Sequence, residues 1–463
     1  MSLTPKLGKR GYFSKVSLCD YRPLVLIVIA AILVRFVFFL ILQPWDPEFV
    51  WEKIMVGDAR HYHGLAVELI KKREYNSPTS QFRTPGYPIF ISLIYTITGV
   101  KPWIVLLIQI VINTITLVLL YILGTQVTDR KTALIAAGLY ALDPLAIYYS
   151  HAILTETLFS LLFLISILTL THGITDKNLK FILTSGFLLG ITTLVKPVTL
   201  YFPIIIVILF LLWPMLKRSF RIKGTICYIL IFFLSLSPWM FRNYHKYGHF
   251  SLTSFQGRNL LHDNATATRK AKTGETYAKI RRDFFDIATS KGATEDGAPT
   301  FYNSKIYNEI AVDYLLNNIN YYVPVHFRGM LLVFIDVGVI GICNYLGLKT
   351  KSLSVEFTTT YHTLGEMTKA FFSIKPTPEL MVSLGFYILL LITYGCFFLG
   401  GIMMIRNGEY SYLLLTILLM LYFSGLPGVI GQARYRVPVI PFYLIASAIG
   451  IKGVFNFMRK RRQ

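Results

Sequence analysis

The chain has 463 residues, of which 54% are hydrophobic and 15% aromatic, and its apolar residues stand in long blocks. This composition excludes a soluble globular protein and indicates an integral membrane protein. The net charge is +22, from 46 Lys and Arg against 24 Asp and Glu. Because the basic residues are scattered between the apolar blocks, they indicate loops that face an anionic leaflet and exclude a nucleic-acid-binding domain.

The first apolar block, residues 24–43, contains one charge, Arg35, and follows an N-terminal tail at residues 1–23. At 1.5 Å per residue it can cross a hydrocarbon core of roughly 30 Å. Later blocks also predict spanning helices, because backbone polar groups in lipid must be satisfied within their own segment. These blocks cover residues 103–123, 132–149, 152–171, 179–195, 200–216, 224–241, 380–405, 412–426 and 437–457.

Two segments leave the number of spans open. Residues 86–99 are short and contain Pro88, so they form either a short span or a juxtamembrane helix. Residues 330–345 contain Asp336 and several glycines. We therefore expect an all-α, polytopic helical bundle with ten to twelve transmembrane helices and with juxtamembrane helices in its first outer loop.

Basic clusters between the spans are expected on the cytoplasmic side, which places both termini inside. This topology divides the chain into alternating outer and membrane regions. The divisions are a cytoplasmic tail at 1–23, the first helix at 24–43, a first outer loop at 44–102, transmembrane helices at 103–241, a large outer loop at 242–327, C-terminal membrane helices at 328–457 with an outer loop at 349–378 that we expect to lie on the membrane, and a cytoplasmic tail at 458–463.

Charged residues stand out in the first outer loop, in the stretch "GDARHYHGLA" at residues 57–66. Asp58 precedes a helical pattern of apolar residues, so it is either an N-cap or a site residue. His61 lies one turn further along and could pair with the acid. His61 and His63 are two positions apart and point to different sides of a helix, which disfavours a metal site.

Two more charges lie at the outer ends of spans, where each is costly unless it lines a cavity or has a partner. Glu156 stands in "SHAILTETLFSLLFL" with no neutralising residue nearby in the sequence. It is either a cavity-lining acid or one half of a salt bridge formed by the fold. Lys196 stands in "TTLVKPVTLYF", directly before a proline, and either serves the site or snorkels to the interface.

Further cations are expected at the outer surface. Arg83 lies in "FRTPGYPIF", where Pro85 and Gly86 predict a sharp bend before the chain enters the membrane. Three more arginines lie at outer helix ends, in "SPWMFRNYHKYG" and "GQARYRVPVIP"; they are Arg242, Arg434 and Arg436. Cations on this side run against the usual bias of Lys and Arg towards the cytoplasm. Several together indicate that an anion binds there.

Two separated carboxylates with a set of cations match the needs of group transfer from a phosphate-linked donor. A carboxylate takes the proton from an attacking hydroxyl, and the cations stabilise the departing phosphate. The predicted catalytic residues are Asp58 and Glu156. The predicted phosphate-binding residues are Arg83, Lys196, Arg242, Arg434 and Arg436, and the candidate lining residues are His61, Tyr62, Tyr87 and His151.

The order and spacing of these motifs resemble the GT-C membrane glycosyltransferases, particularly the lipid A aminoarabinose transferases and protein O-mannosyltransferases. The resemblance rests on "GDARHYHGLA", "RTPGYPIF", "LTETLFSLLFL", "LVKPVTLYFP", "SPWMFRN" and "RYRVPVIPF". It implies an inverting hexosyl or pentosyl transferase that takes its sugar from a polyprenyl-phosphate carrier at the periplasmic or luminal side. The family's first-loop acid falls on Asp58 as general base, and its second acid falls on Glu156. Its phosphate-binding cations fall on Arg83 and Lys196.

The chain departs from the family pattern at Ala59, where many members carry a second acid. A metal-independent site is therefore favoured over one with a divalent cation, and no cofactor is predicted. The expected partners are a polyprenyl-phosphate sugar, a hydroxyl-bearing acceptor and membrane lipid, and the expected location is a bacterial inner membrane. Two alternatives stay open: a transporter or binding protein for polyprenyl phosphate or glycolipid, and a glycan ligase or polymerase.

Overall fold

The structure, a computed structural model, describes residues 21–212, 218–298, 300–348, 369, 373 and 377–462, which form helices and no strand. The helices of the first half are α1 (Arg22–Leu42), α2 (Pro47–Phe49), η2 (Val50–Ile54), α3 (Asp58–Lys72), η3 (Pro78–Ser80), α4 (Gly86–Thr98), α5 (Pro102–Val127), α6 (Arg130–Ala141), α7 (Pro144–Ser150), α8 (Glu156–Thr175), α9 (Leu179–Val195), η4 (Pro197–Thr199) and α10 (Phe202–Leu212). Those of the second half are α11 (Arg218–Tyr247), α12 (Phe255–Arg258), η5 (Asn259–Ala265), α13 (Thr266–Thr273), α14 (Tyr277–Ser290), α15 (Phe301–Leu316), α16 (Ile319–Ile335), α17 (Val339–Tyr345), α20 (Thr377–Arg406), α21 (Tyr410–Gly425), η6 (Ala433–Tyr435), η7 (Val437–Val439) and α22 (Ile440–Arg462).

Among the described residues, six helices are long and apolar enough to cross a membrane, and two bent pairs raise this number to eight. Four shorter apolar helices accompany them: Gly86–Thr98, Leu179–Val195, Pro197–Phe210 and Tyr410–Gly425. The protein is therefore a multi-pass membrane protein, as expected. The expected ten to twelve spans are reached only if some of the shorter helices also cross.

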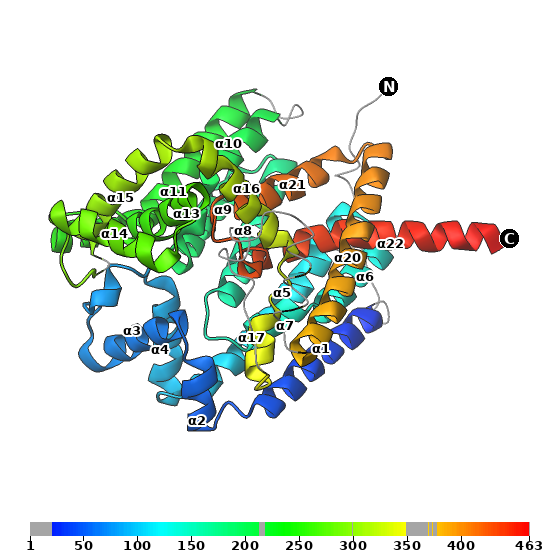
Figure 1. Cartoon of the computed structure of the whole chain (residues 1–463). Coiled ribbons are helices and arrows are strands. Elements are labelled where there is room, and N and C mark those ends of the chain that lie inside the picture. The colour runs from blue at the N-terminus through cyan, green and yellow to red at the C-terminus, as the bar shows by residue number, and fades with distance from the viewer. Residues whose placement is uncertain are drawn as a thin grey trace.

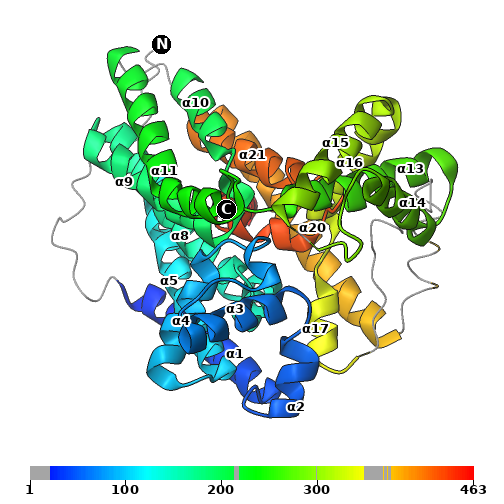
Figure 2. The same ribbon diagram turned by 90° about the vertical axis from the view of Figure 1, so that its left-hand side faces the viewer.

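The spans form one bundle, and the helices of the two loops that are expected to be outer gather at one end of it. Within the bundle α8 packs against α5 and α9, α9 packs against α11, and α22 packs against α20 and α6. Figure 1 shows α3, α4 and α13 to α15 at the end of the bundle opposite to the C-terminal end of α22. Figure 2 looks onto that end, where α3 and α4 lie on one side and α13 to α15 on another.

The apolar block 132–149, expected as one span, is a bent pair. Helix α6 and helix α7 meet at an angle of 56°. Asp143 starts the second helix, since its side chain accepts a hydrogen bond from the Ala146 N–H at 2.9 Å. Arg35 of α1 fills the break and donates to the Ala141 carbonyl at 2.9 Å. Arg35 thus provides a hydrogen-bond donor for a backbone carbonyl at the end of α6, which lipid cannot provide.

A second break lies within residues 330–345, where α16 and α17 meet at 52°. Asp336 ends α16 and accepts a hydrogen bond from the Gly338 N–H at 2.9 Å, and Gly338 has a φ of +66° that favours glycine. The segment is therefore a corner and no straight span. The expected surface helix within 349–378 falls largely outside the described residues, as do residues 1–20 of the expected tail at 1–23.

The polar loop at residues 242–327 is folded into helices. Helices α14 and α15 share a small apolar core with η5, in which Phe284, Tyr307 and Ile310 are buried. We call α12 to α15 with η5, residues 255–316, the outer unit. Chain continuity from α15 into α16 connects this unit to the bundle. The outer unit can therefore hold side chains in fixed positions beside the ends of the spans.

Candidate active site

Asp58 is positioned by the glycine before it. Gly57 is the N-cap of α3 and has a φ of +55°, which only glycine adopts without strain. Asp58 is therefore the first residue inside the helix, and it makes no capping hydrogen bond. Its carboxylate instead accepts hydrogen bonds from Arg83 Nη2 at Oδ1 and from Arg434 Nη1 at Oδ2, the latter at 3.1 Å.

Glu156 has two cationic partners that its sequence neighbourhood does not contain. Its side chain is fully buried at the start of α8. Glu156 Oε1 accepts from Lys196 Nζ at 2.9 Å and from Arg434 Nε at 2.8 Å. The salt-bridge alternative for this acid is confirmed, because Glu156 is paired with two cations.

Arg434 connects the two acids from the short helix η6, and Asp336 holds that helix in place. Asp336 Oδ2 accepts a hydrogen bond from the Ala433 N–H at 2.9 Å, while its Oδ1 accepts one from the N–H of Gly338, the residue before α17. In the sequence Asp336 entered only into the number of spans. A charge within an apolar block is itself a sign of a functional or positioning role.

Arg83 lies in the turn before α4, with aromatic rings around its guanidinium. The guanidinium carbon lies 4.5 Å from the ring centre of Phe82 and 5.1 Å from that of Tyr62. Arg83 Nη2 is 3.2 Å from His61 Nδ1, so His61 contacts Arg83 in preference to the acid. The buried Arg83 Nε finds no partner among the described residues. Two of the candidate lining residues, His61 and Tyr62, therefore line this part of the site.

The Arg83 turn is held against the end of α9, directly before Lys196. A Cβ added to Gly86 would lie 2.7 Å from the backbone of Leu194, and the Thr84 hydroxyl is 3.4 Å from the Val195 carbonyl oxygen that it contacts. The absence of a side chain at Gly86 permits this close approach. The two cations are thus brought to the same side of the acids.

We call these five residues the charge cluster: Asp58, Glu156, Arg83, Lys196 and Arg434. Two carboxylates and three cations leave one positive charge in excess. Burial opposes ionisation of Asp58, but Arg83 and Arg434 outweigh it and lower the pKa of Asp58 to about 2. Asp58 is therefore ionised at neutral pH.

Two of the predicted phosphate-binding arginines lie outside the charge cluster. Arg242 donates to the Tyr75 carbonyl and stacks over Trp239 at 4.7 Å. Since the Tyr75 hydroxyl donates to the Arg83 carbonyl at 3.1 Å, Arg242 supports the Arg83 turn from behind. Arg436 is buried and donates to the Val333 and Phe334 carbonyls, at 2.9 and 3.0 Å. Arg436 therefore satisfies carbonyl groups in the last turn of α16 and does not contact Asp58 or Glu156.

The remaining candidate lining residues have partners of their own. His151 is buried between the Ile147 and Arg35 carbonyls, at 2.8 and 2.9 Å. Tyr87 donates to Gln109 Oε1 at 2.7 Å and packs edge-on against Tyr62. Among the described residues, no three His, Cys, Asp or Glu side chains come together in a group that could hold a metal ion.

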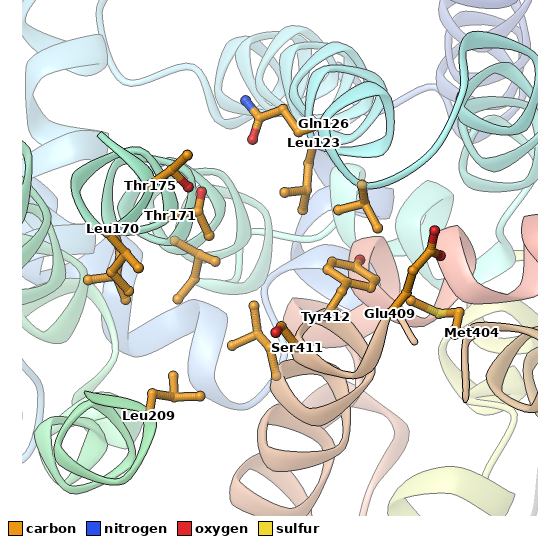
Figure 3. Close-up of a pocket in the computed structure, with 14 residues that line it drawn as sticks. Leu123, Gln126, Leu170, Thr171, Thr175, Leu209, Met404, Glu409, Ser411 and Tyr412 are labelled. Carbon is orange, nitrogen blue, oxygen red and sulfur yellow. The ribbon is translucent and has the colours of Figure 1, made fainter. Parts of the chain in front are cut away.

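A largely apolar pocket lies away from the charge cluster, between α5, α8, α10, α20 and α21 (Figure 3). The empty space in and in front of it, open solvent included, is about 930 Å³. Its lining on α8 begins at Ile167, which at 1.5 Å per residue lies roughly 16 Å from Glu156 along the helix axis. The pocket is therefore near the other end of the spans and contributes nothing to the arrangement of the acids.

A family model described as dolichyl-phosphate-mannose-protein mannosyltransferase matches residues 82–241, which is less than half of the chain. The matched part includes Arg83, Glu156 and Lys196. No curated protein matches the chain.

Among solved structures, the chain is similar to an oligosaccharyltransferase of Archaeoglobus fulgidus in its apo form, with 16% identity and a TM-score of 0.54 over 96% of this chain and 52% of that one. The same enzyme, AglB, in complex with an inhibitory peptide and a dolichol-phosphate matches with 15% identity and a TM-score of 0.50, over 96% and 52%. The chain spans about half the length of this enzyme. It also aligns with ArnT from Cupriavidus metallidurans bound to undecaprenyl phosphate, with 12% identity and a TM-score of 0.37 over 95% and 78%. The fold implied by the resemblance, that of the GT-C membrane glycosyltransferases, is confirmed.

Proposed function

We propose that this protein is a membrane glycosyltransferase that moves a sugar from a polyprenyl-phosphate carrier to a hydroxyl group. The acceptor is a glycolipid, a polysaccharide or a protein, and the reaction takes place on the periplasmic or luminal side of a bacterial inner membrane. The observation that carries the proposal is the charge cluster, a largely buried set of two carboxylates and three cations with one positive charge in excess.

A buried excess charge is costly, so the cluster favours an anionic ligand. Arginine side chains present two N–H groups in a plane that matches the oxygens of a phosphate. In the structure Arg83 Nη2 donates to Asp58, and Arg434 donates to Glu156 from Nε and to Asp58 from Nη1. A donor phosphate can bind by taking over part of these hydrogen bonds, which neutralises the excess charge and releases a carboxylate.

In the proposed reaction the acceptor oxygen attacks the anomeric carbon as the bond from that carbon to the phosphate oxygen breaks. Asp58 takes the proton of the acceptor hydroxyl, and the carrier phosphate leaves with the bonding electrons. Arg83, Arg434 and Lys196 stabilise the charge on that phosphate. Attack opposite to the leaving group inverts the configuration of the sugar.

Donor binding and the activation of the base are linked in this scheme. A carboxylate with a pKa of about 2 is a weak base at neutral pH. When a phosphate takes over hydrogen bonds from Arg83 and Arg434, Asp58 loses part of its stabilisation and becomes more basic. Glu156 keeps Arg434 and Lys196 directed at the phosphate throughout.

The comparisons support a lipid-linked donor. The archaeal enzyme that shares the fold is described in complex with a dolichol-phosphate, and the matched family is described by a dolichyl-phosphate sugar. The same cations would serve a transporter or binding protein for the carrier, and a ligase would use a base other than Asp58. A variant at Asp58 therefore separates these alternatives.

The test compares wild type with Asp58→Asn, using the purified full chain in nanodiscs and a polyprenyl-phosphate sugar as donor. We expect sugar transfer to fall by at least about 100-fold, because a general base is removed. Binding of undecaprenyl phosphate should be kept or strengthened, because a competing carboxylate is lost. Asp286→Asn on the exposed face of α14 is the control for loss of one negative charge. Full turnover by Asp58→Asn would contradict the assignment of the base.

A further inference from the structure

Two turns that are far apart in the sequence are joined beside the charge cluster. One carries Arg83, and the other leads from α11 into α12. The Ser254 N–H donates to the Gln81 carbonyl at 2.8 Å, and the Thr253 hydroxyl donates to the Phe82 carbonyl at 2.7 Å. The rings of Phe82 and Phe255 pack edge to face with centres 4.4 Å apart. The start of α12 therefore has a fixed position relative to the Arg83 turn.

The other side of α12 is held by α15. The Gly257 N–H donates to Ser304 Oγ at 3.1 Å, and a Cβ on Gly257 would lie 2.1 Å from the Ser304 carbonyl oxygen. The Phe301 N–H donates to Gln81 Oε1 at 2.9 Å, which ties α15 to the Arg83 turn as well. Arg258, the last residue of α12, is thus presented from a rigid support.

Arg258 and Arg83 share one aromatic ring. Their guanidinium carbons lie 5.5 and 4.5 Å from the ring centre of Phe82. Both distances are within the range of a cation–π contact, which leaves the N–H edge of the guanidinium available. Two like charges on one ring repel each other unless an anion lies nearby.

No carboxylate of the described residues forms an ion pair with Arg258, and Asp263, whose pKa is raised by burial against the lowering effects of Arg281 and Arg258, is paired with Arg281. The side chain of Arg258 is exposed, and among the described residues it makes no hydrogen bond and no ion pair. Neighbouring arginines of the outer unit are paired: Arg269 contacts Glu275 and Asp283, and Arg281 contacts Asp263 at 3.2 Å. An unpaired arginine next to a cluster that already has an excess positive charge points to a ligand with more than one negative group.

The field around His61 agrees with this charge distribution. Burial lowers the pKa of His61 first, and the cations Arg83 and Arg258 lower it further, against the opposing effect of Asp58. His61 therefore stays neutral at neutral pH and does not add a further positive charge.

We propose that Arg258 forms a second anion-binding position, separate from the one at the charge cluster. It takes a phosphate-type or carboxylate group on the solvent side of Arg83. This inference rests on the proposed function, in which the charge cluster binds the carrier phosphate. The second anion is either the second phosphate of a diphosphate-linked donor or an anionic group of the acceptor.

The test uses Arg258→Gln in the full chain in nanodiscs, with Arg282→Gln, an exposed arginine of α14, as a control of equal charge. Binding of undecaprenyl phosphate and of undecaprenyl diphosphate is measured at one fixed salt concentration. We expect wild type and control to bind the diphosphate about tenfold more tightly than the monophosphate. Arg258→Gln should abolish this preference, leave the affinity for the monophosphate unchanged and keep the wild-type unfolding midpoint.

A second arm identifies an anion from the acceptor. Inorganic phosphate is titrated into protein that is saturated with undecaprenyl phosphate. If inorganic phosphate binds more weakly to Arg258→Gln than to wild type and to Arg282→Gln, the second anion belongs to the acceptor. The proposal is overturned if Arg258→Gln changes none of these affinities, or if it weakens the binding of undecaprenyl phosphate and of undecaprenyl diphosphate equally. Failure of wild type to bind either lipid would contradict the proposed function instead, and a titration with inorganic pyrophosphate alone would then decide the role of Arg258.

Discussion

Arg434 connects the charge cluster, because it donates from two different nitrogens to two acids. Its Nε contacts Glu156 at 2.8 Å and its Nη1 contacts Asp58 at 3.1 Å. A guanidinium makes these contacts from two nitrogens that lie apart in one plane, whereas an ammonium would have to make both from one nitrogen. The proposed coupling of phosphate binding to release of Asp58 depends on this geometry.

We predict that Arg434→Lys, although it keeps the charge, lowers sugar transfer by at least about tenfold. Lysine can satisfy one acid and leaves the other with one cation fewer. The rate of transfer from a polyprenyl-phosphate sugar is measured beside Arg282→Lys, which makes the same exchange on the exposed face of α14. A wild-type rate in Arg434→Lys would show that the bridge has no function.

A second prediction follows from the ionisation of Asp58. Its pKa in the folded protein is about 2, below the ordinary value of 3.8. The ion pairs of Asp58 therefore stabilise the fold fully above about pH 4, and this contribution, about 2 kcal/mol, is lost as the pH falls towards 2. The difference in unfolding midpoint between wild type and Asp58→Asn should be constant from pH 5 to 8 and shrink below pH 4. A difference that persists at pH 2, or vanishes above pH 5, would contradict this.

At the scale of residues, the sequence alone identified all five members of the charge cluster, since charges at the ends of apolar blocks are conspicuous. Their pairing was not predictable, because the partners of Glu156 lie 40 and 278 residues away. Arg434 and Arg436 were treated alike, and only the short helices η6 and η7 turn them in different directions. Arg258 was missed because an exposed arginine in a polar loop does not contrast with its neighbours.

At the scale of helices, the site depends on a close contact between α4 and α9. Gly86 lies against the backbone of Leu194 and Val195, so the Arg83 turn rests on the residues before Lys196. Both ends of this contact carry a cation of the charge cluster. A change in helix spacing here separates the two cations without altering either of them.

We predict that Gly86→Ala destabilises the protein by about 1 to 3 kcal/mol, because its Cβ would meet backbone atoms at 2.7 Å. Sugar transfer should fall with it, as Arg83 moves away from Lys196. Gly64→Ala in α3 is the matched control, since no atom lies within 4 Å of its added Cβ. Thermal unfolding of both variants is compared, and equal midpoints would show that the contact is not tight.

Helix boundaries were predictable where apolar blocks were uniform, as for the block 179–195, which is α9. They were not predictable where a polar residue inside a block ends a helix. Asp143 divides the block 132–149, and Asp336 divides residues 330–345. Asp143 caps α7, and Asp336 accepts a hydrogen bond from the Gly338 N–H directly before α17. Hydropathy values contain no information on such hydrogen bonds.

At the scale of the whole molecule, hydrogen bonds join α15 to the Arg83 turn and join Asp336 at the end of α16 to η6, which carries Arg434. Composition predicted the membrane bundle, because long apolar blocks have few other uses. The helical order of residues 242–327 was not predicted, since a polar loop without an apolar block gives no span signal. That unit supplies Arg258, and through α16 and Asp336 it holds η6 and Arg434.

The most direct test of the account is to identify the lipid that the charge cluster holds. The full chain is purified in mild detergent, and the lipids that accompany it are identified by mass spectrometry for wild type and for Lys196→Met. We predict that wild type carries a polyprenyl phosphate or a polyprenyl-phosphate sugar and that Lys196→Met has lost most of it. Bulk phospholipid alone in both samples, or equal amounts of carrier lipid in both, would contradict the account.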